Sequence, residues 1–280
     1  MKLTVLNISI TMLIASIFVI QSCKKEDKPS KESEHVISVK QGNGVTDIDG
    51  NTYPSTIIGS QEWMAANLKT TRYANGDSLR HVELEEDWKQ LILGAPLFDD
   101  GAWCYYENDS NNNADYGKLY NFHAAIDERG LCPEGWRVPS DDDWHQLAKY
   151  IDPSSIIDSI AFNPLQPNIK IRRDGIESKI AGGHLKSLLL WQDPNKGADN
   201  KTLFNALPAG ARFQYRSNNE EPIYKFREIY KAAAFWTTTK AMEFPPEPEA
   251  HFRLLSFDLP YLEQRKSSFR NGLSVRCVKD

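Results

Sequence analysis

Residues 135–148 read GWRVPSDDDWHQLA, and this stretch carries the clearest local structural signal in the chain. Ser140 follows a proline and is a good N-cap, and Asp143 stands three residues further on, where a capping-box partner belongs. Apolar side chains then recur at helical spacing on one face: Trp144, Leu147 and Ala148. The acidic run 141–143 falls in the first turn, where negative charge suits the helix dipole. We predict an amphipathic helix here; a metal-binding acidic cluster is the alternative for the same run.

Short strands and turns precede this helix. Residues 45–53 read as strand, turn and strand, because Asp49-Gly50 is a strong hairpin signal. Other patterns predict a strand over 57–64 with a turn at 59–60, a helix over 85–93 capped by Gly94, and an aromatic strand over 102–106. Residues 117–126 fit either a strand or the start of a helix.

A long excursion, residues 151–202, follows the helix and contains a short helical stretch at 184–191. Strand patterns then return at 232–239, 251–259 and 273–278, with a Pro-rich loop at 243–249. We find no internal repeat and no second domain boundary. Short strands with two or more helices predict one α+β domain over residues 45–280.

The N-terminal segment is typical of a bacterial lipoprotein. Lys2 precedes a mostly apolar run, and Ser22 stands directly before Cys23. This pattern predicts a signal peptide at 1–22 that is cleaved before a lipidated Cys23, which then anchors the protein in a membrane. An uncleaved anchor helix is the alternative.

Residues 23–44 are polar and charged, and we expect a flexible tether. The charged run at 24–29 resembles the export signal of Bacteroidetes-type lipoproteins. That resemblance implies an outer-membrane protein exposed at the cell surface, with an inward-facing anchor as the alternative.

The charge balance argues against nucleic acid as a partner. The chain has 33 basic and 38 acidic residues, a formal net charge of −5, and the charges are well mixed. A nucleic-acid-binding protein would show a basic patch or stripe. Hydrophobic residues make up 40% of the chain, which is enough to form a substantial core.

The residues with catalytic chemistry do not form a recognisable set. None of the six histidines pairs with a second His or Glu at metal-ligand helical spacing, and no phosphate-cradling glycine loop occurs. Gly-x-Ser-x-Gly is also absent, since the nearest run ends in Arg276. We therefore predict a non-enzymatic protein without a confident metal or cofactor.

One loop alternates oxygen-bearing side chains as calcium loops do: Asp109, Asn111, Asn113 and Asp115. Ala114 at the sixth position and Tyr120 at the twelfth exclude an EF-hand. A solvated turn is the alternative, because Asn and Asp favour turns. Residues 166–168, Gln-Pro-Asn, resemble the sugar-selecting tripeptide of calcium-dependent lectins, but the expected Trp-Asn-Asp partner is absent.

The seven tryptophans are candidates for stacking on sugar rings, although most stand beside apolar core positions. We single out Trp191 and Trp236 as possible recognition aromatics, and we expect Trp191 to be the more exposed.

Five blocks together resemble the Fibrobacter succinogenes major paralogous domain, in its order and over residues 45–280. They are GSQEWMAANLKTT at 59–71, YGKLYNFHAA at 116–125, GLCPEGWRVPSD at 130–141, FWTTT at 235–239 and GLSVRCV at 272–278. The excursion at 151–202 and the loop near 245 depart from that pattern. Some of these blocks also resemble the C-type lectin-like and formylglycine-generating-enzyme-like fold.

Four cysteines are present, and with Cys23 lipidated the other three allow one disulfide and one free thiol. The lectin-like resemblance implies Cys132–Cys277, since such domains often tie the terminal strand to an earlier segment. Cys104 would then be a buried thiol. A bridge from Cys104 to either partner stays open.

The resemblance and the residues together predict a surface-anchored, non-enzymatic binding or adhesion module for a glycan or protein ligand. The excursion would then shape the recognised face, because loops on a rigid scaffold usually carry recognition. The alternatives are a structural or assembly component of an outer-membrane complex and, third, an enzyme of the formylglycine-generating type.

Overall fold

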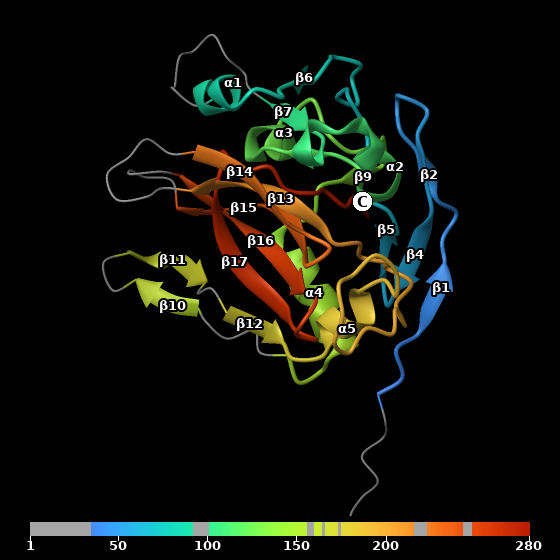
Figure 1. Cartoon of the computed structure of the whole chain (residues 1–280). Coiled ribbons are helices and arrows are strands. Elements are labelled where there is room, and N and C mark those ends of the chain that lie inside the picture. Colours follow the sequence, from blue (N-terminus) through green and yellow to red (C-terminus); the bar gives the residue numbers. More distant parts are fainter. Residues whose placement is uncertain are drawn as a thin grey trace, which may run out of the picture. The chain divides into compact units, whose positions relative to one another are not determined.

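The computed structural model describes residues 35–91, 101–155, 160–163, 166–172, 175–215, 223–242 and 248–280 (Figure 1). One compact unit spans Val36–Asp280. The predicted signal peptide and Cys23 lie outside the described residues. In the described part of the chain, no helix is long and apolar enough to cross a membrane.

A six-stranded sheet forms the largest layer of the unit (Figure 1). Its strands, in spatial order, are β12 (Gly175–Ser178), β17 (Leu262–Ser268), β16 (Glu249–Ser256), β15 (Ala232–Met242), β13 (Ala209–Tyr215) and β14 (Ile223–Ile229). Neighbours pair antiparallel except β13 and β15, which pair in parallel at Gly210 and Ala233. The start of β15 is an unbroken apolar run because residues 232–236 are all buried.

A five-stranded sheet brings the two ends of the unit together. Its order is β1 (Val39–Gln41), β4 (Ser55–Ile58), β5 (Gln61–Met64), β18 (Val278–Lys279) and β9 (Trp136–Arg137). β4 and β5 form a hairpin whose turn contains Gly59 at φ +62°, a conformation that glycine adopts without steric cost. The terminal strand β18 lies between β5 and β9, so the last residues of the chain are part of the core sheet.

Three small sheets complete the strands: β2 (Val45–Thr46) with β3 (Thr52–Tyr53); β10 (Ile160–Asn163) with β11 (Gln166–Arg172); and β6 (Arg80–His81), β7 (Ala102–Cys104) and β8 (Leu119–Tyr120). The helical elements are short: α1 (Glu85–Gln90), η1 (Tyr106–Asn108), η2 (Ser110–Asn112), α2 (Asn113–Tyr116), α3 (Phe122–Ile126), α4 (Asp141–Ile151) and α5 (Ala181–Leu185). The predicted α+β class is confirmed.

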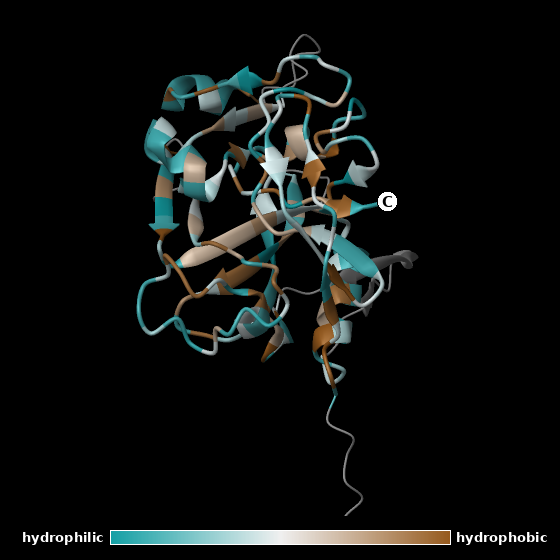
Figure 2. Ribbon diagram, turned by 90° about the vertical axis from the view of Figure 1, so that its right-hand side faces the viewer, coloured by the Kyte–Doolittle hydropathy of each residue, from teal (hydrophilic) through white to brown (hydrophobic). Residues whose placement is uncertain are grey.

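Helix α4 begins where the capping box predicts. The Ser140 hydroxyl accepts the Asp143 N–H at 3.2 Å, and the Asp143 carboxylate accepts the Ser140 N–H at 2.7 Å. Trp144 is fully buried, with its ring 4.9 Å from that of Trp63 and 5.6 Å from that of Phe235. The helix thus fixes one apolar core between the two large sheets. Figure 2 shows hydrophobic residues on many of the strands and hydrophilic residues on many of the surrounding loops.

The acidic run at the start of α4 bonds to arginines. Asp141 pairs with the fully buried Arg253, and both Asp143 oxygens accept from Arg137. Arg253 also donates to Glu177 of β12 at 2.6 Å. The excursion is therefore attached to the core by a buried ionic cluster.

Several sequence expectations are confirmed and several need correction. The hairpin at 45–53, the turn at 59–60 and the strand at 102–104 are present. Residues 117–126 contain both alternatives, since β8 is followed by α3. The short helix of the excursion lies at Ala181–Leu185 rather than 184–191, and the last strand lies at Val278–Lys279 rather than 273–278. Gly94 and residues 243–247 lie outside the described residues.

The predicted tether at 23–44 is too long. Residues 39–41 form β1, which pairs with β4 through Val39 opposite Ile58 and Gln41 opposite Thr56. The polar composition of this stretch misled the prediction, because β1 is an edge strand with mostly exposed side chains.

Candidate ligand-binding site

Two hollows flank the loop that carries Cys132. The hairpin hollow, about 240 Å³, is lined by Thr46, Asp47, Ile48, Thr70, Arg72, Ala74, Leu131, Cys132, Pro133 and Glu134. The helix hollow, about 370 Å³, is lined by Ala125, Ile126, Asp127, Gly130, Leu131, Cys132, Trp136, Arg137, Val138, Thr238 and Lys240. Leu131 and Cys132 belong to both, so the loop is the wall between them.

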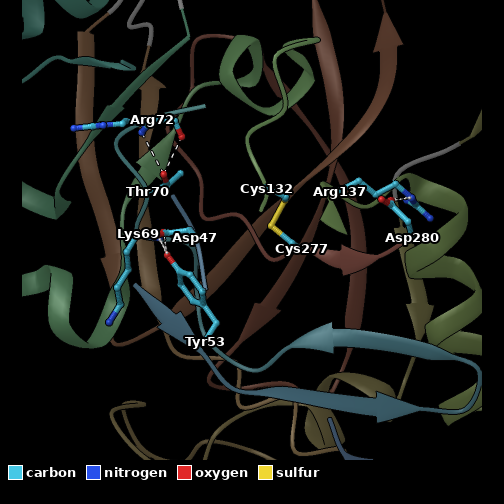
Figure 3. The surroundings of a disulfide bond; sticks show 9 residues. All are labelled: Asp47, Tyr53, Lys69, Thr70, Arg72, Cys132, Arg137, Cys277 and Asp280. Carbon is cyan, nitrogen blue, oxygen red and sulfur yellow. Dashed lines mark hydrogen bonds and ion pairs between the residues drawn. A yellow bond between two sulfur atoms is a disulfide. The ribbon is translucent and has the colours of Figure 1, made fainter. Parts of the chain in front are cut away.

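Asp47 is part of the wall that the hairpin forms in the first hollow. One Asp47 oxygen accepts the backbone N–H groups of Asp49 and Asn51, and the other accepts the Tyr53 hydroxyl at 2.6 Å. The Tyr53 oxygen in turn accepts the Lys69 backbone N–H at 2.9 Å (Figure 3). Burial, together with this bond to Asp47, raises the pKa of Tyr53, so the phenol stays a donor. The hairpin is thus a fixed wall.

Asp49 joins the hairpin to the segment that bears Arg72. Its carboxylate accepts the backbone N–H and hydroxyl of Thr71 and pairs with the Arg72 Nε at 3.3 Å. Burial alone would raise the pKa of Asp49, but these hydrogen bonds and the arginine charge hold it below its ordinary value. The Arg72 side chain stays about half exposed at the hollow.

The Cys132 loop is held at both ends by tight turns. The Gly130 N–H bonds to the Asp127 carbonyl, and the Trp136 N–H bonds to the Pro133 carbonyl. Gly130 and Gly135 both have φ +76°, which suits glycine in such turns. The loop is therefore short and stiff on either side of the cysteine.

The disulfide Cys132–Cys277 ties this loop to the segment just before β18, with Cα atoms 6.0 Å apart (Figure 3). The pairing implied by the resemblance is confirmed. Cys104 carries no disulfide, and burial raises the pKa of its thiol to about 12, so it is a poor nucleophile.

Two of the charged side chains that line the helix hollow form ion pairs with neighbouring residues. Arg129 lowers the pKa of Asp127 through paired hydrogen bonds, one of them 2.7 Å long. Arg137 pairs with Asp143 and, at 3.5 Å, with Asp280 of the C-terminus (Figure 3). The exposed Lys240 and the Thr238 side chain complete a polar rim over an apolar floor of Ile126, Leu131 and Val138.

This arrangement suits recognition of a small amphipathic group. Ligand sites are usually concave, mostly apolar and supplied with a few placed polar groups. The helix hollow is at the small end of the usual range of volumes and the hairpin hollow is below it, so each is about the size for one sugar ring or one side chain of a peptide. Their common wall is fixed covalently, so such a group would meet a preorganised surface.

The predicted calcium loop lies outside both hollows and its side chains bond locally. Asp109 accepts the Asn111 N–H at 2.9 Å as the cap of η2. Asn113 accepts from the Lys118 Nζ at 3.2 Å, while Asp115 is exposed. Over the described residues, no three or more His, Cys, Asp or Glu side chains are grouped to hold a metal ion. The turn alternative therefore accounts for these contacts, and calcium binding stays a prediction.

The two candidate aromatics differ. Trp236 is fully buried and donates to the Tyr120 carbonyl at 2.8 Å, so its selection as a recognition residue was wrong. Trp191 is partly buried, and its indole N–H donates to the Ala206 carbonyl at 2.9 Å. Its position beside Leu188–Leu190, an exposed run, fits the expectation of exposure. Residues 166–168 begin strand β11.

Sequence reasoning missed the hollows themselves. Their walls come from residues 46–48, 70–74, 125–138 and 238–240, which are far apart in the chain. The available signals were the Asp-x-Asp-Gly-Asn spacing of the hairpin and the two glycines that flank Cys132. Each indicates a fixed turn, but neither indicates which turns meet.

Comparison with known proteins identifies a family for most of the chain. A family model described as the Fibrobacter succinogenes major domain matches residues 57–279, which confirms the resemblance. No curated protein and no solved structure matches the chain.

Proposed function

The chain belongs to the Fibrobacter succinogenes major domain family, and we propose that it is a non-enzymatic binding module held at the bacterial surface by a lipid on Cys23. The observation that carries the proposal is the pair of hollows on one disulfide-fixed loop. Apart from residues 46–48 of the hairpin, all residues that line the two hollows lie within the stretch that the family model matches.

A lipid anchor is supported by the sequence before the compact unit. The small residue before Cys23 and the charged run after it match a lipoprotein processed at that cysteine. Attachment in the outer leaflet of the outer membrane would place both hollows in the medium, where a glycan or a protein ligand is accessible.

A C-type lectin-like scaffold is supported by how the unit closes. Strands from the start and the end of the unit share one sheet, and the disulfide ties the terminal segment to an earlier loop. We propose this fold, in which loops at one end of a rigid body recognise the ligand.

The proposal is tested by binding, with one variant for each hollow. The mature chain is screened on a glycan array with and without calcium. Ile48→Ser with Glu134→Ala alters the hairpin hollow, and Thr238→Val with Lys240→Ala alters the helix hollow. Lys225→Ala, an exposed lysine on β14, is the matched control.

We expect one of the two paired variants to weaken binding by about tenfold or more while its melting temperature stays within a few degrees of the parent. The control should bind as the parent does. If the folded protein binds nothing on the array, or if both hollow variants bind normally, glycan recognition at this loop is wrong. In that case we would propose a protein ligand or an assembly role in an outer-membrane complex instead of glycan recognition.

A further inference from the structure

Three consecutive leucines protrude from the excursion. Leu188, Leu189 and Leu190 are 63%, 70% and 42% exposed, and Trp191, which follows them, is partly exposed. The neighbouring Tyr230 is 51% exposed and is joined to this run by the Gln192 N–H, which donates to its carbonyl at 2.7 Å. Monomeric proteins seldom leave such a continuous apolar run in water without a use.

The leucine run is held in place by bonds on both sides. The Ser187 N–H bonds to the Ala206 carbonyl at 2.9 Å, and the Asn195 side chain donates to the Ser187 carbonyl at 3.0 Å. The backbones of Leu190 and Tyr230 take φ values of +68° and +66°, which are unfavourable for residues with large side chains. The fold thus accepts backbone strain at the same place where it exposes apolar groups.

A buried ammonium fixes the base of this loop. Lys186 has no exposed surface, and its Nζ donates to the carbonyls of Lys196, Ser256 and Leu259 at 2.9, 2.9 and 3.0 Å. These carbonyls come from the far end of the loop, from the last residue of β16 and from the segment that follows β16. The exposed leucines therefore stand on a rigid base.

We propose that Leu188–Leu190 insert into the outer face of the lipid bilayer to which the protein is anchored. Leu188, Leu189, Leu190 and the neighbouring Tyr230 are all exposed. A fluid acyl phase can take up several apolar side chains at once without having to match their shape. The membrane part of this inference rests on the proposed lipidation of Cys23.

The tether allows this contact. Val36, the first residue of the compact unit, is 13 residues after Cys23, and 13 residues span at most about 45 Å. A compact unit of 245 residues has a radius of gyration of about 18 Å, so the leucines can reach the same membrane. Ile37, near the start of the unit, and Trp191, which follows the leucines, pack against the same core cluster.

The charges around the loop are balanced. Lys196 and Lys231 are exposed, and so are Asp193 and Glu228. The attraction is therefore mainly apolar, and we expect it to change little between zwitterionic and anionic vesicles or between low and high salt.

Trp191 reports the insertion directly, since the other six tryptophans are buried. Two samples are compared on phosphatidylcholine vesicles that contain brominated acyl chains: the lipidated full protein, and residues 24–280 without a lipid. We expect quenching of tryptophan fluorescence in the lipidated sample and weaker, concentration-dependent quenching in the other. The change Trp191→Phe should remove the quenched signal in both.

Leu188→Ser with Leu189→Ser is the test variant, and Leu84→Ser, which removes a leucine that is 67% exposed beside α1, is the matched control. We expect the test variant to lower vesicle partitioning of residues 24–280 by about tenfold or more, and the control to leave it unchanged. If the double variant melts early, Leu189→Ser alone takes its place.

Equal partitioning of test and control variants would overturn the proposal, and so would a lipidated protein whose tryptophan is not quenched. A dimer in sedimentation that the leucine variant abolishes, without vesicle binding, would assign the loop to self-association instead. Mass measurement of the protein from cells tests lipidation of Cys23 separately. If the protein from cells is not lipidated but its leucines still bind vesicles, the proposed lipid anchor is wrong and the proposed membrane insertion stands.

Discussion

The Cys132 loop and the Leu188–Leu190 loop are both held in place on the unit, but by different interactions. The first is tied by a disulfide to the terminal segment, and its surface mixes carboxylate, guanidinium and apolar groups. The second is tied by one buried ammonium to three carbonyls, and its surface is apolar.

The difference shows what each loop is suited to contact. A concave polar surface on a covalently fixed wall favours a ligand with its own hydrogen-bonding groups. A protruding apolar run favours a phase or surface without such groups. The covalent tie also costs nothing in desolvation, whereas the ammonium tie depends on burying a charge.

Removing the Cys132–Cys277 disulfide should have the largest effect on stability. Cys132→Ser with Cys277→Ser opens a closed loop of 145 residues, and the chain-entropy model predicts a loss of about 4–5 kcal/mol in the free energy of unfolding. Urea unfolding measures this loss, with Cys104→Ala as the control that leaves the disulfide intact. A loss below about 1 kcal/mol would show that the loop is held by its turns alone.

Removing Arg253, which links the excursion to helix α4, should have the next largest effect on stability. Arg253→Met leaves the Asp141 and Glu177 carboxylates buried without their cation, which costs about 3–5 kcal/mol. Arg265→Met, at a position 46% exposed beside Glu263, is the control and should cost less than about 1 kcal/mol. Equal losses for the two variants in urea unfolding would contradict the assigned role of Arg253.

Lys186→Met isolates the base of the leucine loop. It removes the donor that three partly buried carbonyls share, and we expect a loss of about 3 kcal/mol in the free energy of unfolding together with faster amide hydrogen exchange over residues 186–203. The exposed Lys196→Met serves as the control. Unchanged exchange in this stretch would mean that the loop does not depend on the ammonium.

Low pH should lower the free energy of unfolding by weakening the contacts of Asp49 beside the hairpin hollow. We expect this effect to be smaller than those of the three substitutions above. Because the pKa of Asp49 in the folded protein is below its ordinary value of 3.8, the unfolded chain binds more protons at low pH. The stability from Asp49 is therefore fully present above about pH 4 and is lost as the pH falls through the lowered value. Asp49→Asn should flatten this part of the stability–pH curve. Parallel curves for Asp49→Asn and the parent would refute the assigned contacts.

Local features were predictable from the sequence because they depend on neighbouring residues. The capping box of α4 and the hairpin turn at residues 49–50 each lie within a few positions, and both were located correctly. The disulfide needed the family resemblance, because spacing alone allows three pairings among Cys104, Cys132 and Cys277.

Features that join distant segments were not predictable. The hairpin hollow depends on the meeting of Ile48, Arg72 and Leu131, and the ionic cluster on the meeting of Asp141, Glu177 and Arg253. The burial of Trp236 was not predicted for the same reason. A strand with aromatic and small residues in succession does not indicate which side chains are buried until its neighbours are known.

The most direct test of the proposed binding role is glycan-array binding by the mature chain, measured side by side for the parent, the two hollow variants and Lys225→Ala. We predict that the parent and Lys225→Ala bind the same glycan and that one hollow variant binds it about tenfold or more weakly while still folded. Equal binding by all four proteins, or no binding by the folded parent, would contradict recognition at the Cys132 loop.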